Sequence, residues 1–305
     1  MSTFLEKLKA EKKDLKQSSI NTYNRNVKRL FRILSTKAVP PSDHKWLNNK
    51  KISDWYDNQP LSVRRHMSTA ANVALQVYGK EDKTWKSRQR KTMEEFDTER
   101  RKRKLTDKQK AKIPDKGFDS LKGVISQMKK ELRHIISKIE TLSDLLRVQD
   151  LVILSLYHEL PLRLDYATLH TEKHEKENHI VKQKRKPAGW TIVLHEFKTA
   201  KSLGSKRFRL SQGNQRLLNK FVPAVIKLTD HGYMLTNRKG GKMSKQVLSK
   251  TLMKLTKARI GKTFSVQLLR ILYAMKNRDV IETAKDVSEK LLHSQSQSLQ
   301  YAKKV

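Results

Sequence analysis

The sequence has no cysteine among its 305 residues. This excludes disulfides, thiolate zinc sites and cysteine nucleophiles together, and it is typical of proteins from reducing compartments. No run of about 18 apolar residues is present, so no segment is long enough to cross a bilayer as a helix. The first residues are charged and lack the apolar core of a secretion signal. We therefore expect an intracellular protein without a membrane partner.

Acidic residues are also scarce, with 30 Asp and Glu against 67 Lys and Arg, which gives a formal net charge of +37. A compact protein of this charge repels itself unless an anion lies against it. Composition leaves three readings open: a nucleic-acid partner, an acidic membrane surface, or a basic protein without chemistry. Nucleic acid is the favoured one.

The first hundred residues have helical periodicity. Apolar residues recur at helical spacing in residues 20–34 and again in residues 63–77, with Gly79 ending the second stretch. We expect core packing for the three tryptophans Trp46, Trp55 and Trp85. The polar faces carry cations that can contact DNA phosphates; these are Arg25, Lys28, Arg29, Arg32, Arg64 and Arg65.

A basic segment at residues 100–117 follows and ends near Pro114 and Gly117. Like charges in sequence cannot pack against one another, so we predict an exposed linker or strap that can lie along phosphates. The same run also fits a nuclear address in a eukaryotic cell, or simply a solvated charge run. Its five consecutive cations are Arg100, Arg101, Lys102, Arg103 and Lys104.

The second half combines helices with a few strands. Residues 142–158 are apolar nearly all round, which predicts a buried helix. Alternating patterns predict strands at 191–197 and 206–211, joined by a long basic loop, and a third strand at 233–237. Helices are expected at 118–139, 244–259, 264–277 and 279–292. The predicted fold is mainly α: a helical domain at 1–99, the linker, and a domain at 118–305 with a small antiparallel sheet.

Four segments place groups suited to a phosphate near the ends of these elements. Arg163 follows the buried helix at a proline break, and Lys198 and Lys201 lie in the hairpin loop. Arg270 lies in an otherwise apolar helix, where burial without an anionic partner would be costly. His293 and Tyr301 lie near the C-terminal end. Taken alone, each arginine could instead pair with a carboxylate, Asp150 or Asp165 in the case of Arg163.

In this order the segments resemble the tyrosine recombinase family of the phage-integrase type. The stretch PLRLDYATL is similar to the family's first arginine box, QLLRILYA to its second, and LLHS to the third, which precedes the nucleophilic tyrosine. The combination is similar to recombinases carried by viruses and mobile elements of eukaryotes. The N-terminal stretch SSINTYNRNVKRL likewise resembles the helical core-binding domain of these enzymes.

The resemblance implies roles for single residues. Arg163 and Arg270 would be the catalytic arginines, Lys198 the hairpin lysine with Lys201 as its rival, His293 the third-box residue and Tyr301 the nucleophile. It also implies duplex DNA as the partner, a tetramer on DNA, no cofactor and no small-molecule substrate. Gln267 departs from the family, which usually has histidine there, and glutamine cannot exchange a proton near neutral pH. Tyr301 follows His293 by eight positions, one fewer than is common.

Three histidines invite a zinc interpretation: His170, His174 and His179. Their segment HTEKHEKENH is polar, and we expect a solvated connection with no metal.

Three functions stay open: a site-specific recombinase or integrase, a type IB topoisomerase-like or telomere-resolving enzyme, and an inactive DNA-binding relative that lost catalysis with Gln267.

Overall fold

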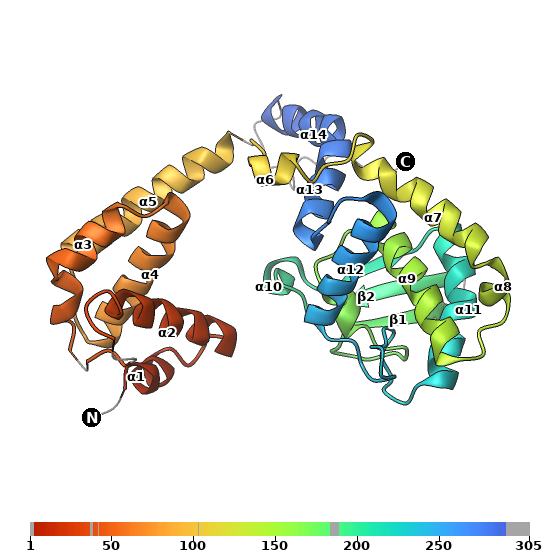
Figure 1. Cartoon of the computed structure of the whole chain (residues 1–305), viewed down its shortest axis with the longest axis horizontal. Helices are drawn as coiled ribbons and strands as arrows, with labels where there is room; N and C mark the ends of the chain where they lie inside the picture. The colour runs from red at the N-terminus through yellow and green to blue at the C-terminus, as the bar shows by residue number, and fades with distance from the viewer. Residues whose placement is uncertain (1–2, 37–38, 42, 103, 184–188, 291–305) are drawn as a thin grey trace. The chain divides into compact units, whose positions relative to one another are not determined.

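The computed structural model describes residues 3–36, 39–41, 43–102, 104–183 and 189–290. It divides into two compact units, Met1–Leu105 and Thr106–Val305 (Figure 1). The division falls within the segment 100–117. The predicted fold class, mainly α with a small antiparallel sheet, is confirmed. Within the described ranges no helix is both long and apolar enough to cross a membrane.

The first unit is built around α4, whose small residues Ala70, Ala71 and Ala74 are fully buried. Because these side chains end at Cβ, α2 and α5 can pack closely against α4. The opening of α5 is fixed by Asp82, whose carboxylate accepts a hydrogen bond from the Trp85 amide at 2.9 Å. The helices described in this unit are α1 (Phe4–Glu11), α2 (Gln17–Phe31), η1 (Lys45–Asn48), α3 (Lys50–Asp57), α4 (Leu61–Val77) and α5 (Lys83–Arg101).

The tryptophans of this unit belong to its core. Trp46 and Trp85 are buried, and the indole Nε1 of Trp85 donates to the Leu47 carbonyl at 3.3 Å. Trp55 is half-buried and packs against the same core, with the Arg29 guanidinium 5.5 Å from its ring centroid. The expectation of core packing is confirmed for Trp46 and Trp85.

The basic segment begins on a helix, and the linker or exposed strap at 100–117 stays a prediction. α5 continues to Arg101, and two of the cations reach back to acids on the same helix. Arg100 lies 3.6 Å from Asp97, and Lys102 pairs with Glu99. Such i, i+3 pairs relieve part of the repulsion between neighbouring cations. Arg103 lies outside the described residues.

The second unit packs around α9, whose buried residues include the polar Gln149 and Ser155. Gln149 satisfies both ends of its amide on the backbone of Thr236, at 2.7 and 2.9 Å. Helices α7, α11 and α12 pack against α9. The described helices are α6 (Asp107–Lys110), η2 (Gly117–Asp119), α7 (Ser120–Glu131), α8 (Arg133–Ser137), α9 (Leu142–Glu159), η3 (Asp165–Thr168), α10 (Ala200–Leu203), α11 (Gln212–Leu228), α12 (Lys245–Ile260), α13 (Val266–Lys276) and α14 (Arg278–Lys290).

The sheet has the order β1–β2–β3 and is antiparallel throughout. Its strands are β1 (His179–Gln183), β2 (Gly189–Leu194) and β3 (Lys206–Arg209). β2 is the central strand and is buried along its length, and Figure 1 shows β1 and β2 crossing the middle of this unit. β2 and β3 form the hairpin expected from the sequence, with α10 in its loop.

The third strand was predicted in the wrong place. The segment 233–237 forms only isolated bridges, Tyr233 with His170 and Thr236 with Lys242. The remaining strand of the sheet is β1, which follows directly on the polar stretch that we expected to be a solvated connection. Its first residue, His179, is buried, with only 3% of its surface exposed. Polar residues before the strand obscured its short alternating pattern.

Candidate active site

The loop after α9 carries Arg163, and two buried tyrosines hold its backbone through hydrogen bonds. The Tyr157 hydroxyl donates to the Arg163 carbonyl at 2.7 Å. The Tyr166 hydroxyl donates to the carbonyls of Leu156 at 3.1 Å and Leu160 at 2.5 Å. The two rings meet edge to face with centroids 5.0 Å apart. Since both rings are fully buried, the loop backbone is fixed while the Arg163 side chain stays exposed.

Arg270 lies on α13, which begins after the capping residue Ser265. The helix buries Leu268, Leu269 and Leu272, and Arg270 lies on its exposed side. The guanidinium Nη1 of Arg270 donates to the Pro161 carbonyl at 3.1 Å, across 109 positions of sequence. Arg270 is therefore not buried in an apolar core, which removes the cost that the sequence suggested. The hydrogen bond instead ties α13 to the loop that carries Arg163.

The two arginines are close enough for their charges to repel. Partial burial lowers the pKa of Arg270, the positive charge of Arg163 lowers it further, and Asp165 opposes both effects. In the described part of the chain, neither guanidinium forms an ion pair with a carboxylate. Two guanidiniums held together without a counter-anion can each bind non-bridging oxygens of one phosphate.

The carboxylates proposed as alternative partners are engaged differently. Asp165 is buried, and burial raises the pKa of its carboxyl while Lys245 and Arg163 pull it back. Asp165 thus offsets part of the charge of Arg163 without forming an ion pair with it. Asp150 lies on α9 near Arg238 and Arg259, and burial raises its pKa to about 6. Asp150 is therefore no partner of Arg163.

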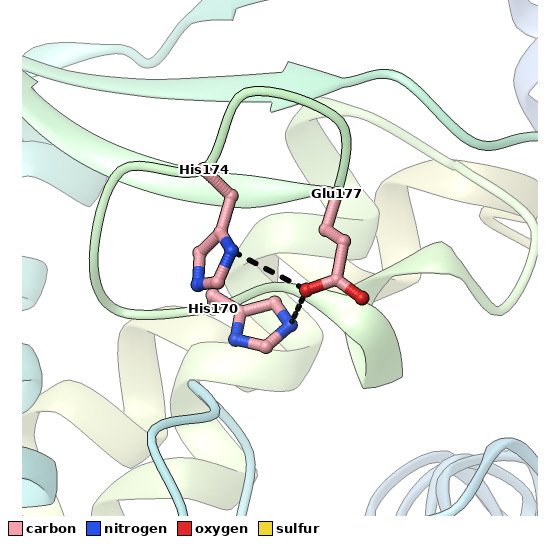
Figure 2. A group of neighbouring side chains, drawn as sticks. All are labelled: His170, His174 and Glu177. Carbon is pink, nitrogen blue, oxygen red and sulfur yellow. Dashed lines mark ion pairs between the residues drawn. The ribbon is translucent and has the colours of Figure 1, made fainter.

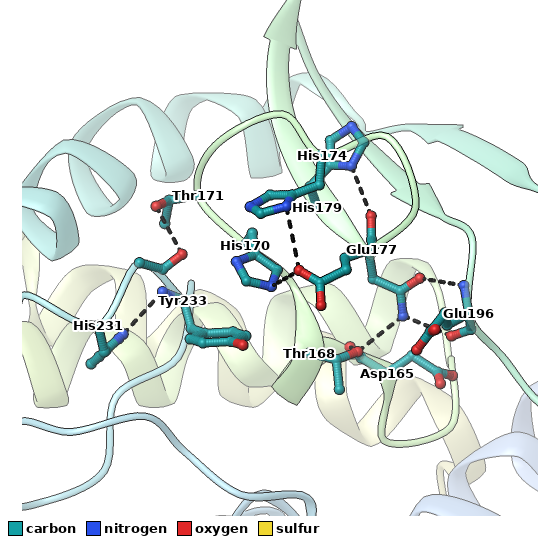
Figure 3. A network of polar contacts seen from close by, with 12 residues as sticks. Asp165, Thr168, His170, Thr171, His174, Glu177, His179, Glu196, His231 and Tyr233 are labelled. Atoms are coloured by element: carbon teal, nitrogen blue, oxygen red, sulfur yellow. Dashed lines mark hydrogen bonds and ion pairs between the residues drawn. The ribbon is translucent and has the colours of Figure 1, made fainter.

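The hairpin lysines are exposed in the loop between β2 and β3, Lys198 in a turn and Lys201 on α10. Among the described residues, neither lysine side chain forms a hydrogen bond or an ion pair. The start of their loop is nevertheless tied to η3 by the buried Asn178. Its amide nitrogen donates to Thr168 Oγ1 at 3.0 Å and to the Glu196 carbonyl at 2.7 Å. Figure 3 shows Asp165, Thr168 and Glu196 in this network.

Asn178 also accepts hydrogen bonds, so that its side chain forms four in all, to three residues. Its side-chain oxygen accepts from the amides of His195 and Glu196, both at 2.8 Å. One buried side chain thereby fixes the position of η3, shortly after Arg163, relative to the loop that holds Lys198. The choice between Lys198 and Lys201 stays a prediction.

The remaining residues of the predicted site are only partly described. Gln267 is exposed on α13, three positions before Arg270, so the two lie on neighbouring parts of one helix surface. His293 and Tyr301 lie outside the described residues.

The predicted DNA-contacting cations of the first unit fall into two groups. Arg25, Arg29 and Arg32 are exposed and Lys28 half-buried, all at or beside α2. Arg64 is engaged within the unit and pairs with Glu95 at 3.0 Å. The Arg65 guanidinium lies over the Phe96 ring, 3.9 Å from its centroid. These contacts give Arg64 and Arg65 structural partners that the sequence did not reveal.

Three residues that position the site were missed from the sequence: Tyr157, Tyr166 and Asn178. For the two tyrosines a signal existed, because polar hydroxyls on a buried stretch need partners. Asn178 carries no such local signal.

One group of side chains could hold a metal ion, which departs from the expectation of a solvated, metal-free connection. His170, His174 and Glu177 place their ligand atoms within 4.8 Å of one another. Figure 3 shows this group beside His179 and Tyr233. His179 does not share in it, because its Nδ1 lies 3.1 Å from the Glu177 carbonyl and the residue begins β1.

No protein-family model and no curated protein matches the chain. A solved structure described as the crystal structure of XerA recombinase is similar to it with a TM-score of 0.36 and 10% sequence identity. The match covers 99% of this chain and 93% of that chain. A likeness of this size says nothing about catalytic residues, and no family membership follows from it.

Proposed function

We propose that the protein is a site-specific DNA recombinase or integrase that cleaves and rejoins duplex DNA through a 3′-phosphotyrosine. One observation carries the proposal. Arg163 and Arg270 come from distant segments, lie within electrostatic range of each other and form no ion pair with a carboxylate in the described chain. A phosphodiester is the anion that two such groups can bind, and the surplus of positive charge favours DNA as its source.

The chemistry follows from where charge develops. The Tyr301 oxygen attacks the scissile phosphorus, the bond from phosphorus to the 5′-oxygen breaks, and the tyrosine proton leaves to a base. The 5′-oxygen takes a proton from Lys198 or Lys201. Arg163 and Arg270 stabilise the extra negative charge on the non-bridging oxygens. The phosphotyrosine stores the energy of the broken bond, so religation runs the same steps in reverse without a nucleotide cofactor.

Partners and assembly belong to the same proposal. The exposed cations of α2 and the basic segment at residues 100–117 would contact the phosphates of duplex DNA. The enzyme would act as a tetramer on DNA, with exchange of the terminal helix between subunits. In a eukaryotic host the basic segment would also direct the protein to the nucleus.

Gln267 supports a second candidate, an inactive DNA-binding protein derived from such an enzyme. Its amide can still donate a hydrogen bond to a phosphate oxygen, but it cannot accept the tyrosine proton near neutral pH. A covalent adduct separates this candidate from every enzymatic one. Strand exchange between two duplexes then separates a recombinase from a topoisomerase-like or telomere-resolving enzyme.

The test begins with a DNA site, which random-sequence duplexes enriched on the purified protein would supply. A nicked suicide substrate of that site should then yield protein joined to a 3′-phosphate, seen as a shifted band on a denaturing gel. Tyr301→Phe should abolish the adduct and leave DNA binding unchanged, because only one hydroxyl is lost. Tyr273→Phe, which alters an exposed tyrosine near Arg270, is the matched control and should keep it. An undiminished adduct with Tyr301→Phe would show that another residue attacks.

A further inference from the structure

The connection between η3 and β1 folds back so that three side chains converge. The Glu177 oxygen Oε2 lies 3.0 Å from His170 Nε2 and 3.3 Å from His174 Nδ1. Figure 2 shows both imidazoles turned toward this one oxygen. Two rings and one carboxylate thus present three metal-binding atoms from a stretch of eight residues.

The spacing of these atoms suits a small tetrahedral ion. Zinc binds histidine nitrogen and carboxylate oxygen at about 2.0–2.2 Å, which places two ligands of a tetrahedron roughly 3.3 Å apart. The two separations from Glu177 Oε2, 3.0 and 3.3 Å, are close to that value, and all three ligand atoms lie within 4.8 Å of one another. Two imidazoles with one carboxylate form a donor set that zinc uses in proteins, with the fourth position left for water.

The backbone around the group is already ordered by contacts that do not involve the three side chains. The His170 amide donates to the Asn178 carbonyl at 2.9 Å, and the His170 carbonyl accepts from the Ile180 amide at 2.9 Å. Asn178 is itself clamped by its four hydrogen bonds. The two ends of the loop are therefore held together, and binding an ion would cost little ordering of the chain.

The first ligand is also oriented by packing. The His170 ring lies between two others, with centroids 4.0 Å from His174 and 4.1 Å from Tyr233. Thr171, the next residue, is anchored to the Gly232 carbonyl through its amide at 3.0 Å. The His174 side chain is 38% exposed and that of Glu177 is 55% exposed, so an ion can reach the group from solvent.

We propose that His170, His174 and Glu177 bind one divalent transition-metal ion, for which Zn²⁺ is the best fit. The ion would lock the connection between η3 and β1 and leave one coordination position for water. This site is separate from the proposed DNA chemistry, which needs no metal, and it neither rests on that function nor depends on finding the DNA target.

The test uses the untagged full chain, stripped of metal by a chelator and titrated with ZnCl₂ in a calorimeter. We expect one equivalent to bind and the melting temperature to rise with Zn²⁺, because an ion that binds only the folded state stabilises it. Co²⁺ in its place should give the intense visible bands of a tetrahedral site. The chain has no cysteine, so thiolates cannot produce this signal.

Variants assign the site. His174→Ala and Glu177→Gln should each weaken Zn²⁺ binding about tenfold or more, since each removes a direct ligand. Glu175→Gln changes an exposed acid of the same loop and should leave affinity unchanged. Absence of Zn²⁺ binding in the unaltered protein would overturn the proposal and leave two histidine–glutamate ion pairs. Equal affinity in His174→Ala, or an equal loss with Glu175→Gln, would overturn it too.

Discussion

Two pairs of arginines, one in each unit, are held in opposite ways. In the first unit Arg64 pairs with Glu95 at 3.0 Å, and Arg88 pairs with Asp57 at 3.2 Å. In the second unit the charge of Arg163 lowers the pKa of Arg270, and neither arginine forms an ion pair with a carboxylate in the described chain. The charges of Arg64 and Arg88 are balanced within the fold. Arg163 and Arg270 have no ion-pair partner in the described chain, and we propose that a DNA phosphate binds them.

The means of positioning differ as well. Arg64 and Arg88 are held by charges, while the loop of Arg163 is held by neutral donors, chiefly the Tyr157 hydroxyl. Neutral hydrogen bonds fix the backbone without neutralising the positive charge of the guanidinium. A site that binds an external phosphate needs both a fixed geometry and a positive charge that no carboxylate neutralises.

The largest effect should come from removing the unpaired arginines. Arg163→Ala and Arg270→Ala should each slow single-turnover cleavage by about 100- to 1,000-fold or more, because each takes a charged donor from the transition state. Arg88→Ala is the matched control from the paired group, and its cleavage rate at saturating protein should stay at the level of the unaltered chain. Equal losses in all three variants would erase the distinction between paired and unpaired arginines.

Loss of a neutral positioning group should have a smaller effect. Tyr157→Phe removes the 2.7 Å hydrogen bond to the Arg163 carbonyl and leaves that partly buried acceptor without this donor. We expect the free energy of unfolding to fall by about 1 kcal/mol in urea titrations. Cleavage should slow while DNA affinity holds. A variant that is destabilised but cleaves at full rate would show that the hydroxyl supports the fold and not the arginine.

The salt dependence of DNA binding tests the contrast between paired and unpaired arginines within the first unit. Arg25 is exposed, whereas Arg64 is committed to Glu95. If Arg25 contacts a phosphate, Arg25→Ala should reduce the slope of log affinity against log salt by about 1. Arg64→Ala should reduce it by less, because its charge is already paired. Filter binding between roughly 50 and 200 mM salt measures both slopes. The reverse ranking would show that pairing within the fold does not predict DNA contact.

Gln267→His should have the smallest effect. It introduces a residue that can exchange a proton beside Arg270, so adduct formation should be equal or modestly faster. A pH profile of the cleavage rate would detect the new group as an added inflection near the usual pKa of histidine, about 6.5. A strong loss of activity would show that the glutamine amide is itself required at this position.

Local sequence patterns predicted most helices and strands, whereas the candidate site is formed by contacts between segments distant in sequence. The apolar run of α9 and the alternation of β2 and β3 could be recognised in the sequence. Arg163 and Arg270 could also be recognised there, as unusual cations near the ends of elements. β1 was missed because polar residues precede it. The order of the strands depends on a pairing that no single stretch encodes.

The positioning groups were hidden for the same reason. Asn178 looks like one more polar residue of a loop, yet its four hydrogen bonds reach η3 and the segment after β2. The contact of Arg270 with Pro161 spans 109 positions. The exposed position of Arg270 was not evident from the sequence, because periodicity places a residue on a helix but does not say which neighbours cover it.

The central claim is that Arg163 and Arg270 bind the charged oxygens of the scissile phosphate. Changing the charge of that phosphate tests it directly. A methylphosphonate at the cleavage position replaces one charged oxygen with a methyl group and so removes part of the need for a guanidinium. The account predicts that Arg270→Ala, shown by melting temperature to be folded, fails on the phosphodiester but forms the Tyr301 adduct on the methylphosphonate. If folded Arg270→Ala is equally inactive on both substrates, while the unaltered protein cleaves them, the arginine does not act on phosphate charge and the account is contradicted.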